Sequence, residues 1–184
     1  MRQTIWPAVV EQWGSTATER AEPFPCDGLL SEPDCTLFRA VDVQAPPATT
    51  FRWLCQLRAA PYSYDTLDNF GRRSPQTLTP GLERLAPGQR FQTIFKLVEF
   101  EPGRSLTMWS SGRVFGRVAC TYRADPAGEG GSRIVVKVLA GYPRAVHRPL
   151  MRLLVPPGDA LMMRRQLLNL KRLAERPARA GELA

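Results

Sequence analysis

Histidine and paired cysteine are scarce in this chain of 184 residues. His147 is its one histidine, so Ser-His-Asp or Cys-His catalysis would have to use it as the base, and a surface histidine among arginines is the simpler interpretation. The four cysteines are Cys26, Cys35, Cys55 and Cys120, of which Cys26 and Cys35 could pair. None belongs to a C-x-x-C pair, and no carboxylate spacing suggests a zinc site. We therefore expect neither a metal nor a cofactor.

Long apolar stretches are also missing. No uninterrupted apolar run approaches the roughly 20 residues that a membrane-spanning helix needs. The first residues, MRQTIWPAVVEQWG, hold only a short apolar patch with a tryptophan and a proline, which makes a poor signal peptide. The sequence therefore indicates a soluble, cytoplasmic protein, and its length fits one domain better than two.

Lysine is rare as well, with three residues against many arginines, although the net charge is +8. Residues 143–176 hold eight basic side chains and only two acidic ones. A basic face of this kind can bind nucleic acid or an acidic membrane surface, which makes the C-terminal region a candidate interaction surface. Because the chain is also rich in alanine and proline, the arginines are typical of codon composition as much as of phosphate binding. We do not expect nucleic acid as the partner, and we predict no particular oligomeric state.

Hydrophobic alternation and turn residues divide the chain into an arm, one domain and a tail. Residues 1–35 are aperiodic, apart from a short helix near Trp6 to Trp13, and predict an arm that lies on a domain of residues 36–176. Residues 177–184 are expected to be a flexible tail. Pro46-Pro47 suits the first turn of a helix through Thr50 to Arg58. The segments that predict antiparallel strands are Thr36–Val43, Arg90–Phe100, Ser105–Ser110, Val114–Arg123 and Arg133–Ala140.

The alternation also assigns a face to each side chain of the last two strands. The positions expected to face the core are Val118, Cys120, Tyr122, Ile134, Val136 and Val138. The positions expected to face water are Arg117, Thr121, Arg123, Arg133 and Lys137. A one-sided sheet of this kind must cover its apolar face with another element.

A long amphipathic helix near the C-terminus is the expected cover. Asp159 is placed to cap a helix that runs to about Glu175. At 100° per residue its apolar arc consists of Met162, Met163, Leu167, Leu170, Leu173 and Ala174. Gln166 is a polar residue within that arc. Its amide either reaches solvent at the edge of the contact or is aimed at something buried between helix and sheet.

Five stretches in series carry a resemblance to a known group of proteins. They are WGSTATE at Trp13–Glu19, VDVQAPPATTFRWL at Val41–Leu54, YSYDTLDNFGRR at Tyr62–Arg73, LAPGQ at Leu85–Gln89 and MMRRQLLNLKRLAE at Met162–Glu175. Together they resemble a bacterial branch of the START-like, or SRPBCC, superfamily, which includes polyketide cyclase/dehydrase-like proteins. The resemblance implies the helix-grip fold of the α+β class. In that fold a curved antiparallel sheet wraps around a long C-terminal helix and leaves an internal apolar cavity.

The resemblance further implies that the cavity binds a hydrophobic small molecule or lipid. The residues expected to line it are Trp53, Tyr62, Tyr64, Trp109, Val118, Tyr122, Met163, Gln166, Leu167 and Leu170. Because Met108 and Trp109 point to opposite faces of one strand, at most one of them faces inward. The alternative is an enzyme of the polyketide cyclase, aromatase or dehydratase type, with Tyr64 and Asp65 as weak acid–base candidates.

The polar residues of Tyr62–Arg73 also fit a well-capped loop. Ser63 or Asp65 can cap a single helical turn, Thr66 to Phe70, which Gly71 ends. The other expected roles are inward-pointing side chains for Leu67 and Phe70, backbone contacts for Asn69, and ion pairs with an aspartate for Arg72 and Arg73. In this interpretation the aspartates hold the loop in shape, and Tyr62 and Tyr64 remain as ligand contacts.

Overall fold

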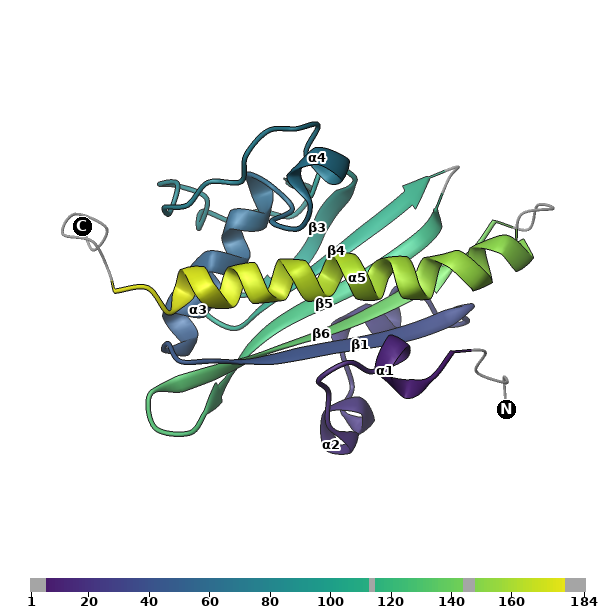
Figure 1. Ribbon diagram of the computed structural model, residues 1–184, viewed down its shortest axis with the longest axis horizontal. Coiled ribbons are helices and arrows are strands. Elements are labelled where there is room, and N and C mark those ends of the chain that lie inside the picture. Colours follow the sequence, from purple (N-terminus) through teal and green to yellow (C-terminus); the bar gives the residue numbers. More distant parts are fainter. Residues whose placement is uncertain (1–5, 113–114, 144–147, 178–184) are drawn as a thin grey trace.

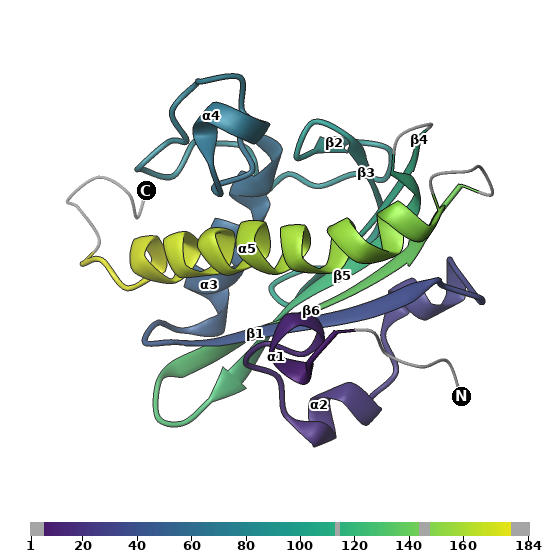
Figure 2. The ribbon, with the colours of Figure 1, turned by 45° about the vertical axis from the view of Figure 1, so that its right-hand side comes forward.

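The computed structural model describes residues 6–112, 115–143 and 148–177. It contains one antiparallel sheet with the spatial strand order β1-β6-β5-β4-β3-β2. The strands are β1 (Cys35–Val43), β2 (Arg90–Phe91), β3 (Phe95–Glu101), β4 (Ser105–Gly112), β5 (Gly116–Ala127) and β6 (Gly131–Gly141). Helix α5 (Arg148–Ala174) crosses one face of this curved sheet (Figures 1 and 2). The predicted α+β class and helix-grip arrangement are confirmed.

The strand predicted over Arg90–Phe100 is interrupted. It is divided into β2 and β3 by a turn at Gln92 and Thr93, where φ is +42° and +69°. These positive angles lie outside the extended region, so the strand cannot continue through them. The backbone N–H of Gln92 donates to the carbonyl oxygen of Leu57 at 2.9 Å and holds the turn against the preceding helical segment.

Helix α5 is longer than the sequence predicts. It begins at Arg148 and runs through Pro156 and Pro157. A proline lacks the N–H that would bind the carbonyl four residues earlier, which for Pro156 is that of Arg152. The indole Nε1 of Trp6 donates to this Arg152 oxygen at 3.2 Å, so the N-terminal arm supplies a hydrogen bond that the helix lacks.

Asp159 therefore does not cap the helix, as was expected, but lies within it. Its carboxylate accepts a hydrogen bond of 2.7 Å from Arg39, a fully buried residue of β1. The prediction was wrong because Pro156-Pro157 reads locally as a helix start, whereas contacts with distant residues keep the preceding turns helical.

The main core lies between α5 and the sheet, and the predicted apolar arc faces it. The buried members of the arc are Met163, Leu167, Leu170, Leu173 and Ala174, while Met162 is half-buried. Helix α3 (Pro47–Cys55) and the 3₁₀ helix η2 (Gln56–Arg58) add buried side chains to the same core.

The far face of the sheet is also covered, although the sequence predicts that it faces water. The alternation itself is right, because Thr121 and Lys137 point away from α5. The 3₁₀ helix η1 (Pro25–Gly28) nevertheless buries them: the Cys26 N–H donates to Thr121 Oγ1 at 3.1 Å, and Lys137 Nζ pairs with Asp27 at 2.6 Å. A second apolar cluster forms there from Phe24, Cys26, Leu30, Phe38, Ala40, Ala119, Val135 and Leu139.

The rest of the arm contacts the free edge of β1 near Ala40. Helix α1 (Ala8–Glu11) lies beside this strand, and α2 (Ala17–Ala21) follows it along the arm (Figure 2). The Ala40 N–H donates to the Trp13 carbonyl at 3.0 Å, and a Cβ at Gly14 would lie only 2.0 Å from the Ala40 oxygen, so this approach requires glycine. All four cysteines are free, so the pairing of Cys26 with Cys35, which the sequence left open, does not form.

Candidate functional site

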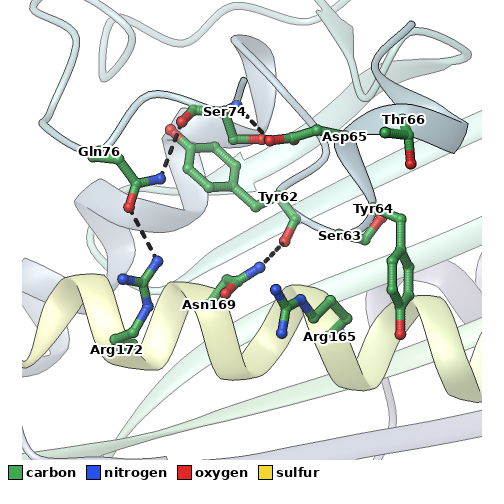
Figure 3. A pocket seen from close by; sticks show the side chains of 10 residues that line it. All are labelled: Tyr62, Ser63, Tyr64, Asp65, Thr66, Ser74, Gln76, Arg165, Asn169 and Arg172. Carbon is green, nitrogen blue, oxygen red and sulfur yellow. Dashed lines mark hydrogen bonds between the residues drawn. The ribbon is translucent and has the colours of Figure 1, made fainter. Parts of the chain in front are cut away.

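A pocket of about 300 Å³ lies between segment 62–76 and the C-terminal half of α5 (Figure 3). The segment contains the short helix α4 (Asp65–Asp68), which stands beside α5 in Figure 1. From segment 62–76, the residues that line the pocket are Tyr62, Ser63, Tyr64, Asp65, Thr66, Ser74 and Gln76. Those from α5 are Arg165, Asn169 and Arg172. The tyrosine-rich stretch singled out in the sequence thus borders open space.

Asp65 closes the loop of this segment. Its two carboxylate oxygens accept hydrogen bonds from Ser74, one from the backbone N–H at 3.0 Å and one from Oγ at 2.6 Å. Helix α4 starts after Tyr64 without a side-chain cap, so the expected capping by Ser63 or Asp65 is wrong. The Asp65 carboxylate instead holds the two ends of the loop together, because both of its oxygens accept hydrogen bonds from Ser74.

Asp68, the last residue of α4, is held by Ser63, which precedes the helix. Its Oδ2 accepts from the Ser63 hydroxyl, while its Oδ1 is buried without a partner. Burial, with Asp65 as a smaller contribution, raises the pKa of Asp68 above its ordinary value of 3.8. The Asn69 amide donates to the Arg72 carbonyl at 2.6 Å, which is the backbone contact expected for it.

Two other expectations for this segment are wrong. Leu67 and Phe70 do not point inward but are 73% and 83% exposed, because α4 stands outside the core and Tyr62 takes the inward position. Arg72 and Arg73 form no ion pair with either aspartate in the part of the chain that the structure describes. The carboxylates are instead held by serine hydroxyl groups.

The α5 side of the pocket is a stripe of polar residues. Arg165, Asn169 and Arg172 are spaced four and three apart, which places them on one face of the helix. Asn169 Nδ2 donates to the Tyr62 carbonyl at 2.8 Å, and Arg172 donates to the Gln76 amide oxygen at 3.0 Å. The Arg165 guanidinium lies 5.9 Å from the centre of the Tyr64 ring. Both arginines thus meet neutral partners in the segment (Figure 3).

Tyr62 separates the pocket from the main core. It is 1% exposed, and its ring meets Trp53 edge to face with 6.3 Å between the ring centres. Its φ of +59° is strained for a residue with a side chain, and its buried hydroxyl has no hydrogen-bond partner. Burial raises the pKa of Tyr62, so the hydroxyl stays neutral and can donate. Strained backbone and an unpaired polar atom coincide at this residue.

The space between helix and sheet is filled at the positions predicted to line a cavity. The hydroxyl of Tyr122 accepts from Gln92 Nε2 at 3.1 Å and donates to Gln166 Oε1 at 2.7 Å. Gln166 Nε2 in turn donates to the Pro61 carbonyl at 2.6 Å, so the amide is aimed into the interior. Tyr122 and Gln166 are at most 3% exposed, and Leu167 and Leu170 are fully enclosed.

The structure therefore brings together only part of the predicted lining. Tyr62 and Tyr64 border the pocket, and Trp53 lies behind Tyr62. Val118 and Met163 pack in the main core with Tyr122. Trp109 points to the far face of the sheet and packs against the second cluster, because Met108 takes the inward position on β4. Trp109 cannot contribute to a site between helix and sheet.

Sequence reasoning missed most of the polar lining. Ser74 and Gln76 lie beyond the motif that carried the resemblance, and nothing in their sequence context marks them. Arg165, Asn169 and Arg172 lie outside the predicted apolar arc of the C-terminal helix, and their spacing of four and three is a signal that could have identified them. The sequence does not indicate that segment 62–76 faces this row of polar residues on α5.

No metal site or membrane span is found in the described ranges. These residues contain no group of three or more histidine, cysteine, aspartate or glutamate side chains that could hold a metal ion. They also contain no helix that is both long enough and apolar enough to cross a bilayer. His147 lies outside the described residues.

The fold and the pocket define a helix-grip protein with an open site beside the C-terminal helix. No family model matches the chain, and a comparison with curated protein sequences gave no match. Solved structures do match. The hypothetical protein jhp0584 of Helicobacter pylori has a TM-score of 0.53 and 12% identity over 87% of this chain and 99% of that one.

Two further structures are similar to the same degree. A Rhodobacter sphaeroides protein has a TM-score of 0.51 and 16% identity, covering 75% of this chain and 91% of its own. The di-domain ARO/CYC BexL from the BE-7585A biosynthetic pathway has a TM-score of 0.50 and 13% identity, covering 76% of this chain and 46% of its own. These likenesses establish the fold expected from the resemblance to the START-like superfamily.

Proposed function

We propose that this protein binds a small amphipathic molecule, with its polar end in the pocket between segment 62–76 and α5 and its apolar part against the tyrosine rings. The observation that carries the proposal is the composition of the pocket. Its volume of about 300 Å³ is at the lower end of the range for small-molecule sites, and its lining joins two tyrosines to amides, hydroxyl groups, guanidinium groups and the Asp65 carboxylate.

Tyr62 supports the proposal because its present conformation is costly. A non-glycine residue with φ of +59° stores about 1–3 kcal/mol of strain. A buried hydroxyl without a partner costs about 1–3 kcal/mol in addition. Rearrangement of Tyr62 around a ligand would recover part of both costs. It would also give the apolar part of the ligand access to Trp53, which lies directly behind it.

Binding, and not turnover, is what the geometry supports. Asp65, one of the two acid–base candidates, has both oxygens engaged by Ser74. Tyr64, the other candidate, faces the Arg165 guanidinium. BexL, whose ARO/CYC description names a biosynthetic role, shares the fold at 13% identity, and that level of similarity carries no reaction over to this chain.

The test is a ligand screen with a variant that fills the pocket. A panel of lipids, fatty acids and polyketides is screened by thermal shift, and hits are confirmed as one-to-one complexes by native mass spectrometry. A ligand of about 20 non-hydrogen atoms at ~0.3 kcal/mol per atom gains ~6 kcal/mol, which corresponds to a Kd of roughly tens of micromolar.

Thr66→Trp is expected to abolish the shift, because Thr66 is an exposed residue of the lining and an indole there occupies the pocket without disturbing the core. Thr77→Trp is the matched control, since Thr77 is also exposed but lies outside the lining. If no apolar or amphipathic compound stabilises the wild-type protein, or if Thr66→Trp binds as well as the control, the proposal is wrong.

A further inference from the structure

Building on the proposed function, we infer that the polar end of the ligand is an oxyanion, a carboxylate or a phosphate, held by Arg165 and Arg172. The bound molecule would then be an anionic amphiphile and not a neutral one. The argument rests on the partners that these two guanidinium groups have, on those they lack, and on the direction in which they point.

Neither arginine is neutralised within the described residues. Arg172 donates to the uncharged amide oxygen of Gln76, and Arg165 lies over the face of Tyr64. Neither takes part in any ion pair of N–O distance up to 4.0 Å with a described carboxylate. On the same helix, Lys171 is paired with Glu175 at 2.5 Å, and on β6 Arg133 is paired with Glu19 and Asp42. Two positive charges thus line the pocket without an ion-pair contact to any described carboxylate.

The acidic residues of segment 62–76 form hydrogen bonds with other groups. Asp65, which itself lines the pocket, receives both of its side-chain hydrogen bonds from Ser74. Asp68 receives its hydrogen bond from Ser63. The serines therefore hold these carboxylates within the loop and keep them from pairing with the arginines. If these carboxylates served to neutralise the arginines of α5, they would point toward the helix instead.

The positive charges on this face of α5 favour the binding of an anion. Burial, and after it the nearby positive charges of Arg176 and Arg165, lower the pKa of Arg172. An oxyanion between the two guanidinium groups would relieve that repulsion. It would also accept charge-assisted hydrogen bonds, which are shorter and stronger than those between neutral groups.

The geometry allows both arginines to reach one ligand. They flank Asn169 on a single stripe of α5, and Figure 3 shows all three side chains directed toward segment 62–76. The Asn169 amide donates to the Tyr62 carbonyl, so the centre of the stripe is joined to the segment. The Tyr62 hydroxyl, which lacks a partner, is an additional donor for an anion once this side chain moves.

The experiment compares ligands that differ only in the head group. Decanoate, decyl phosphate and 1-decanol are titrated into the full chain by calorimetry, below the concentrations at which they form micelles. Wild-type protein is expected to bind the two anions about 10- to 100-fold more tightly than the alcohol, which is the range for hydrogen bonds to charged groups. Comparing the two anions shows whether carboxylate or phosphate is preferred.

Variants then assign the preference to the two arginines. Arg165→Gln and Arg172→Gln should each reduce the anion preference, and the double variant should bind anion and alcohol alike. The control is Arg164→Gln, which removes the same charge from the neighbouring position, where the guanidinium lies over Trp13 and outside the pocket. It should keep the preference.

The outcomes separate this inference from the proposed function. If the wild-type protein binds decanol as tightly as the anions, or if Arg164→Gln loses as much preference as Arg165→Gln, the inference is wrong and the pocket still binds a ligand. If none of the three compounds binds, both the inference and the proposed site fail for this class of molecule.

Discussion

Tyr62 and Tyr122 are both buried, but their hydroxyl groups have opposite surroundings. The hydroxyl of Tyr122 joins Gln92 and Gln166, whereas that of Tyr62 has no partner. Burial raises the pKa of both phenols, so both remain neutral. Removing the oxygen is the same chemical change at each site, and its effect on stability depends on what the oxygen contacts.

Tyr122→Phe should lower the free energy of unfolding by about 1–3 kcal/mol, because it removes the partner of the buried Gln166 Oε1 and of the half-buried Gln92 Nε2. Tyr62→Phe should leave that free energy unchanged or raise it by up to about 1–3 kcal/mol, because it removes an unpaired buried hydroxyl. Urea denaturation of both variants measures the two values. Equal losses in the two variants would contradict the hydrogen-bond assignments.

At the scale of elements, α5 depends on the arm for its N-terminal turns. Arg152 has a carbonyl that Pro156 cannot bind, and Trp6 donates to it from the other end of the chain. The arm therefore does more than cover the far face of the sheet. It stabilises the part of α5 that the sequence does not predict to be helical.

Trp6→Phe should reduce stability by about 0.5–1.5 kcal/mol, since it deletes this hydrogen bond and retains most of the ring. In a Pro156→Ala background, residue 156 regains the N–H that binds Arg152, so the same substitution should cost less. A double-mutant cycle, measured by denaturation, gives the coupling energy between Trp6 and Pro156. Amide exchange over residues 148–155 shows whether the loss of stability lies in the first turns of α5. An identical cost in both backgrounds would show that Trp6 acts by packing alone.

At the scale of the whole molecule, Asp34 joins three distant segments. Its carboxylate accepts from the Tyr142 N–H at 2.8 Å and from the side chains of Arg148 and Arg152, so the arm, the end of β6 and the start of α5 meet there. Burial alone would raise its pKa, but these hydrogen bonds hold the pKa of Asp34 below its ordinary value of 3.8.

The pKa shift at Asp34 predicts a loss of stability in acid. Because the pKa is lower in the folded than in the unfolded chain, the stabilisation is present above the unfolded value of 3.8 and is lost as the pH falls through the folded value. Asp34→Asn should cost about 1–3 kcal/mol at neutral pH and should flatten the decline below pH ~4.

Stability curves against pH for the wild type, Asp34→Asn and the exposed control Glu129→Gln test this. If the stability of Asp34→Asn declines below pH ~4 as steeply as that of the wild type, Asp34 is not the source of the acid sensitivity.

The sequence by itself determined the local pattern of the protein. Alternation placed Cys120, Tyr122 and Val136 on the inner face of the sheet, and the 100° spacing placed Leu167 and Leu170 on the buried side of α5. These features follow from the periods of strand and helix, which nearby residues are sufficient to define. The resemblance added the helix-grip arrangement, which the structure confirms.

The tertiary structure decided what covers each face and where the open space lies. Cys26 buries Thr121 across 95 positions of sequence, and Arg39 meets Asp159 across 120. The pocket arises because segment 62–76 folds onto the stripe of Arg165 and Arg172. Such contacts depend on how distant segments are brought together, and the period of a single strand or helix carries no information about its distant partner.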